Sequence, residues 1–76
     1  MLQESLRLGY LLSEKCELQK AEEAFQRALT LAREQNDQRV MMEVISALLR
    51  LAGEALDGRA IQKWDEELDR LIASFP

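Results

Sequence analysis

The segment LGYLLSEKCELQKAEEAFQRAL, residues 8–29, decides the fold class of this chain of 76 residues. Its apolar and small residues recur 43 positions later in residues 51–72, LAGEALDGRAIQKWDEELDRLI, where eight positions align at one offset. Each copy has apolar residues at helical spacing on both sides of a polar break, which predicts a pair of helices. Repetition of a helix pair indicates an array in which successive pairs stack on each other.

The apolar spacing predicts four helices, at about residues 3–14, 18–35, 38–56 and 59–74. Polar segments separate them. In the second of these, Asn36 can adopt the left-handed conformation that ends a helix, and Asp37 can cap the helix that follows. Asp57-Gly58 is a turn signal at the third break. We therefore expect a single all-α domain.

Gly9 lies in the middle of the first predicted helix, where glycine costs about 1 kcal/mol relative to alanine. Its best explanation is the close approach of a neighbouring helix. The same helix is apolar on nearly all sides, which predicts that it is sandwiched between neighbours. The second and fourth helices each carry one apolar stripe, and these stripes are Leu18, Ala21, Ala24, Phe25, Ala28, Leu29 and Ala32, then Ile61, Trp64, Leu68, Leu71 and Ile72.

Composition excludes several classes of protein. The net charge is −4 and the basic residues are scattered, which argues against nucleic-acid binding. Cys16 is the only cysteine, so an internal disulfide is impossible and a reducing compartment fits. The longest nearly apolar run, residues 40–49, is about half a membrane span, and no signal peptide is visible. We expect a cytoplasmic protein that does not bind membranes.

The first copy resembles a tetratricopeptide repeat (TPR). The residues that carry the resemblance are Leu8, Gly9, Leu12, Cys16, Leu18, Ala21, Phe25, Ala28 and Leu29. The second copy is degenerate, because Trp64 stands where the family has a small residue, whereas Pro76 fits the family's terminal proline. The resemblance implies a fragment of a TPR-like α-α superhelix with four antiparallel helices in two helix-turn-helix repeats, at about residues 2–37 and 38–76. The 43-residue period exceeds the family's 34, which implies longer helices.

In this family the first helix of each repeat lines a concave face that binds peptides or partner helices. The resemblance therefore implies a partner-binding face formed by Gln3, Leu6, Arg7, Tyr10, Ser13, Ser46, Leu49, Arg50 and Gly53. Arg7 and Arg50 align at the 43-residue offset, which predicts two guanidinium groups side by side above an apolar floor, suited to an acidic-apolar peptide. The alternative is that Leu6, Tyr10 and Leu49 pack against neighbouring repeats or each other.

Catalysis is not expected. The chain has no histidine, its single cysteine lacks an activating base, and its three glycines are isolated. Neither a cofactor nor a metal is implied. The remaining hypotheses are a protein-interaction module in a larger scaffold or regulatory protein and a structural unit that forms a homo-oligomer. The second stays open because two repeats leave an apolar flank uncovered.

Overall fold

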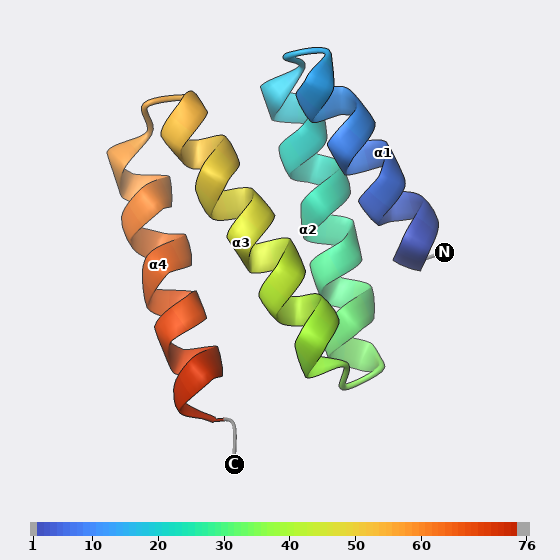
Figure 1. Cartoon of the computed structure of the whole chain (residues 1–76), viewed down its shortest axis with the longest axis vertical. Helices are drawn as coiled ribbons and strands as arrows, with labels where there is room; N and C mark the ends of the chain where they lie inside the picture. Colours follow the sequence, from blue (N-terminus) through green and yellow to red (C-terminus); the bar gives the residue numbers. More distant parts are fainter. Residues whose placement is uncertain (1, 75–76) are drawn as a thin grey trace.

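The computed structural model describes residues 2–74, which form four α-helices and no strands (Figure 1). The helices are α1 (Leu2–Glu14), α2 (Leu18–Glu34), α3 (Gln38–Glu54) and α4 (Gly58–Ala73). Each helix runs antiparallel to the one before it, and extensive contacts join consecutive helices only. The four predicted helices are confirmed to within two residues at each end. Pro76, which the resemblance aligned with a terminal proline, lies outside the described residues.

The three turns between the helices are built alike. Each contains one residue with left-handed backbone, namely Cys16 (φ 62°), Asn36 (φ 55°) and Leu56 (φ 54°). The next residue donates its amide hydrogen to a carbonyl in the last turn of the helix just ended, in the pairs Glu17–Leu12, Asp37–Ala32 and Asp57–Ala52. This is the Schellman pattern that ends many helices. The turns are therefore spaced 20 residues apart along the chain.

Two aspartates cap the first turns of α3 and α4. The Asp37 carboxylate accepts a hydrogen bond from the Val40 amide, and the Asp57 carboxylate accepts one from the Ala60 amide, each at 3.2 Å. Both bonds satisfy an amide that has no partner inside its own helix. The expected roles of Asn36 and Asp37 are thus confirmed, whereas Gly58 is simply the first residue of α4.

The two hairpins are equivalent at an offset of 40 residues, so the offset of 43 is wrong as a structural register. Helix α1 ends at Glu14 and α3 at Glu54, while α2 begins at Leu18 and α4 at Gly58. A shift of three residues is a rotation of about 300°, close to a full helical turn, so the apolar stripes still overlap at the wrong offset. At the correct offset Arg50 corresponds to Tyr10 and not to Arg7.

The core is centred on α2 and α3. Helix α2 buries Ala21, Ala24, Phe25, Ala28, Leu29 and Ala32, and α3 buries Val44, Ile45, Ala47, Leu48, Leu51 and Ala52. The predicted stripe of α2 is confirmed, with Leu18 partly buried beside it. Gly9 is the buried residue of α1, where it faces the ring of Phe25. The expected close approach at Gly9 is therefore confirmed.

The two outer helices are covered on one side only. In α4 the one buried residue is Trp64, and the predicted core residues Ile61 and Ile72 are exposed. In α1 the side chains of Leu8 and Leu11 are also exposed, so the sandwiched position expected for this helix is wrong for the described chain. Within residues 2–74, α1 packs mainly on α2. None of the helices in residues 2–74 is long and apolar enough to cross a membrane.

Candidate partner-binding groove

A groove runs between α1 and α3. Its wider part is a cleft of about 490 Å³ near the start of both helices, lined by Leu2, Gln3, Leu6, Gln35, Asp37, Val40 and Glu43. The apolar part of the lining comes from both helices and consists of Leu2, Leu6 and Val40. Two carboxylates and two amides complete the lining. A volume of this size lies in the usual range for sites that hold a small molecule or several side chains.

Tyr10 joins the two helices in the middle of the groove. Its hydroxyl donates a hydrogen bond to Oε1 of Glu43 at 3.1 Å. Its ring meets the ring of Phe25 edge to face, with centroids 5.1 Å apart at 78°. Partial burial and the neighbouring Glu43 carboxylate raise the pKa of the Tyr10 hydroxyl above its ordinary value of 10.0, and Arg50 opposes them. Tyr10 is therefore neutral and donates a hydrogen bond at physiological pH.

Beyond Tyr10 the groove narrows and its charge changes sign. The narrow part, about 10 Å³, is lined by Tyr10, Ser13, Phe25, Ala47, Arg50 and Leu51. Glu43 and Arg50 lie on the same side of α3, two helical turns or about 10 Å apart along the axis. The groove thus has an acidic end at Asp37 and Glu43 and a basic end at Arg50.

The structure brings together some of the residues predicted for the partner-binding face. Gln3 and Leu6 line the wide cleft, and Tyr10, Ser13 and Arg50 line the narrow one. Arg7 and Ser46 are exposed and line neither part.

Two further predicted residues of α3 contribute little to the groove. Leu49 is half-buried against the core, and Gly53 is exposed with open space around it. The expected pair of guanidinium groups is not assembled, because Arg50 lies opposite Tyr10 whereas Arg7 lines neither part. In place of a second guanidinium group, the groove has the carboxylates of Asp37 and Glu43 at its wide end.

The residues of α3 that line the wide cleft were not predicted from the sequence. Val40, Glu43 and Ala47 share a helix face with Arg50, at spacings of three, four and three residues. The error comes from the offset, since adding 43 to the α1 positions selects the neighbouring face of α3. The correct offset of 40 pairs Gln3 with Glu43 and Tyr10 with Arg50. The even spacing of the turns, 20 residues apart, is the signal from which the offset of 40 could have been predicted.

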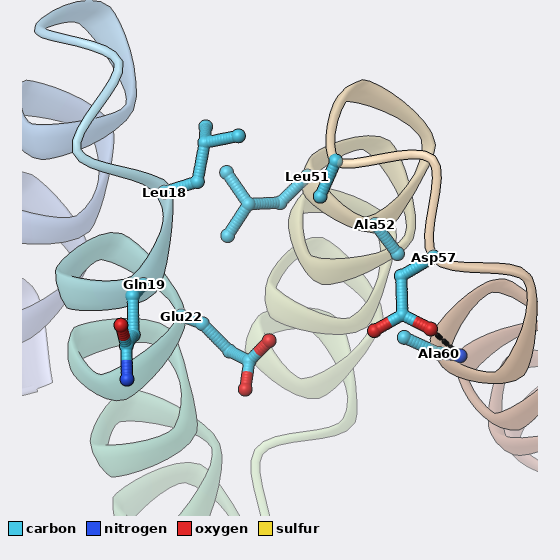
Figure 2. Close-up of a pocket in the computed structure, with 8 residues that line it drawn as sticks. Leu18, Gln19, Glu22, Leu51, Ala52, Asp57 and Ala60 are labelled. Atoms are coloured by element: carbon cyan, nitrogen blue, oxygen red, sulfur yellow. Dashed lines mark hydrogen bonds between the residues drawn. The ribbon is translucent and has the colours of Figure 1, made fainter.

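A second cavity, of about 250 Å³, lies on the other side of α3 (Figure 2). Leu18, Gln19 and Glu22 of α2 line one wall; the rest is formed by Leu51, Ala52, Ala55, Asp57 and Ala60. The Asp57 carboxylate is one of the lining groups and also caps α4, as the dashed line to Ala60 shows. The cavity is smaller than most small-molecule sites, and the small residues at the end of α3 account for it.

Within residues 2–74, no three cysteine, aspartate or glutamate side chains are grouped to hold a metal ion. No family model, curated protein or solved structure matches the chain.

Proposed function

We propose that this chain is a protein-interaction module of the tetratricopeptide type, which binds a peptide or a partner helix in the groove between α1 and α3. The observation that carries the proposal is the wide cleft, where Leu6 and Val40 from two different helices lie among polar side chains. An apolar surface ringed by groups that form hydrogen bonds is typical of peptide-binding grooves. The antiparallel hairpins and the contact between Gly9 and Phe25 also agree with the resemblance.

The charges of the groove select the chemistry of the partner. Asp37 and Glu43 at the wide end favour a lysine or arginine whose aliphatic stem lies on Leu6 and Val40. Arg50 at the narrow end favours a carboxylate about two helical turns further along the partner. The partner is thus an amphipathic segment with a basic and an acidic residue at this separation, in place of the acidic-apolar peptide expected from the sequence.

The role proposed here is non-enzymatic and needs no cofactor. It suits a scaffold or regulatory protein of the cytoplasm in which this module presents its groove to other proteins. The absence of histidine from the sequence and the use of Glu43 and Tyr10 in a mutual hydrogen bond support this view.

Selection of peptides tests the groove. A library of random short peptides displayed on phage is selected against the whole chain, and the affinities of the selected peptides are measured by calorimetry. We expect the enriched peptides to combine apolar residues with a basic and an acidic residue, and we expect Glu43→Lys and Arg50→Glu each to weaken their binding about tenfold or more. Circular dichroism checks that both variants stay helical.

Glu54→Lys is the matched control, because Glu54 is exposed at the end of α3 and lines no part of the groove. It changes the charge by the same amount as Glu43→Lys and should leave the affinity unchanged. Peptides that bind both groove variants as tightly as the native chain would show that the groove is not the binding site.

A further inference from the structure

We propose that two copies of this chain associate through the outer side of α1, antiparallel to each other about a twofold axis. The surface is the outer stripe, which we define as Glu4, Leu8, Leu11 and Lys15. These residues are all exposed, and the spacing of four, three and four places them on one side of the helix. The Lys15 amide still donates to the Leu11 carbonyl at 3.2 Å, so the helical geometry continues through Lys15.

The equivalent surface of α3 already packs against another helix. At the offset of 40 residues, Leu8 and Leu11 correspond to Leu48 and Leu51, which are 1% and 4% exposed in the core beside α2. In α1 the corresponding leucines are 41% and 47% exposed. The outer side of α1 thus has the apolar residues of a helix-packing face, and none of the helices in residues 2–74 covers it.

The order of residues along the outer stripe makes it complementary to itself. It reads acid, leucine, leucine and base from Glu4 to Lys15. When a second copy runs in the opposite direction, Glu4 faces Lys15 of the second copy and Leu8 faces Leu11 of the second copy. A twofold axis generates each of these contacts twice, as an isologous dimer requires.

A second pair of charges agrees with this arrangement. Arg7 and Glu14 lie together along one edge of the outer stripe, and in antiparallel helices this edge faces the same edge of the second copy. Arg7 of one copy therefore lies near Glu14 of the other. Neither these two residues nor Glu4 and Lys15 form an ion pair within the described residues. In this arrangement the four charges form complementary pairs between copies.

The opposite flank of the molecule, on α4, also exposes two apolar residues, Ile61 and Ile72, but two aspartates lie between them. In α4, Asp65 and Asp69 are exposed at the positions that correspond to the buried Phe25 and Leu29 of α2. Packing this flank against the outer stripe of another copy would place carboxylates on leucines. A closed pair through α1 is therefore favoured over a head-to-tail chain of copies.

This dimer is independent of the proposed partner groove. Leu8 follows Leu6 by two positions, which is a rotation of about 200° around α1, so the outer stripe and the groove lie on opposite sides of the helix. Two leucines from each copy make a small interface, below the 1,200 Å² or so of a stable complex. We expect a dimer that forms reversibly, with a dissociation constant on the order of 0.1–1 mM.

Charge exchange tests the arrangement directly. Glu4 and Lys15 of one copy are about 16 Å apart along α1, so they cannot pair with each other. We expect the native chain to approach twice its monomer mass of 8.7 kDa in sedimentation equilibrium at high concentration. We expect Glu4→Lys and Lys15→Glu, each alone, to stay monomeric, because like charges then face each other twice.

An equimolar mixture of the two variants should restore the dimer, because every charged pair is then complementary. Misfolding of either variant cannot produce this recovery. Asp69→Lys is the control with the same change of charge on α4, and it should dimerise like the native chain. The proposal would be overturned by any of three results. These are a native chain that stays monomeric, a dimer that neither charge exchange affects, and a mixture of the two variants that stays monomeric. Loss of peptide binding in the Glu43→Lys variant would not contradict the dimer, because Glu43 is not part of the outer stripe.

Discussion

Gly9 packs so closely on Phe25 that a Cβ atom added to the glycine would lie 2.7 Å from two carbons of the ring. The ring cannot easily move, because it is 1% exposed and contacts Tyr10 edge to face. We expect Gly9→Ala to lower the free energy of unfolding by about 1–2 kcal/mol, since overpacking outweighs the gain in helix propensity. Urea unfolding followed by circular dichroism measures the change.

Gly53 provides the matched control for this change. It also lies in a helix, but nothing within 4 Å would meet an added Cβ atom. Gly53→Ala should therefore raise the stability by up to about 1 kcal/mol. If both alanines were to stabilise the chain, the close packing of α1 on α2 would be wrong.

Leu56 has a left-handed backbone that leucine adopts at a cost of about 1–2 kcal/mol. Its side chain is 88% exposed, so little packing would be lost on its removal. We expect Leu56→Gly to raise the free energy of unfolding by about 0.5–1 kcal/mol, after allowing for the flexibility of glycine in the unfolded chain. Leu56→Ala keeps the backbone cost and should have almost no effect. Thermal unfolding of the two variants distinguishes them.

Asp57 should contribute about 1 kcal/mol through its bond to the Ala60 amide at the start of α4. Asp57→Ala removes the acceptor, whereas Asp57→Asn keeps an oxygen that can accept the same bond. We therefore expect the alanine variant to be destabilised and the asparagine variant to remain close to the native chain. Trp64 is the only tryptophan and is buried in the α3–α4 hairpin, so its fluorescence reports unfolding there. Equal losses in the two variants would exclude the cap as the cause.

Tyr10 should make the stability fall at alkaline pH. Its pKa is higher in the folded chain than the ordinary value of 10.0, because of partial burial and then Glu43. The stabilisation is therefore fully present below pH 10 and is lost as the pH rises through the folded pKa. In Tyr10→Phe this part of the decline should be absent, which urea unfolding at several pH values measures.

The pKa itself can be measured without interference, because Tyr10 is the only tyrosine. The ultraviolet absorbance of tyrosinate then reports one group. In Glu43→Gln the midpoint should move down towards 10, since the carboxylate that opposes ionisation is gone. A midpoint that does not change would mean that the hydrogen bond between α1 and α3 is not formed in solution.

The sequence was sufficient to locate the helices, because their apolar stripes and breaks are local signals. Asn36 and Asp37 are residue types that suit a helix end and a cap, and both act as expected. The left-handed backbone of Leu56 could not be predicted from its residue type, since leucine rarely adopts this conformation. The adjacent Asp57-Gly58 is a stronger turn signal, and it lies just after Leu56. Only the spacing of the turns identifies Leu56.

The groove was predicted in part, for a geometric reason. Tyr10, which the resemblance assigned to the partner-binding side of the first helix, lines the narrow part of the groove beside Phe25. The side of α3 that faces it depends on the register between hairpins, and an error of three residues turns the helix by about 60°. Glu43 was missed for this reason, and with it the acidic end of the groove.

The packing of each helix mainly on its sequence neighbours has a consequence for how the chain folds. Contacts of this kind close short loops, so we infer folding that is fast and can begin in either hairpin. The hairpins meet chiefly where α2 packs on α3, with the Tyr10–Glu43 hydrogen bond and the Arg33–Glu67 ion pair beside it, and this interface transmits unfolding from one half to the other. A change that weakens it should separate the melting of the two halves, so that Trp64 reports one transition and Tyr10 another.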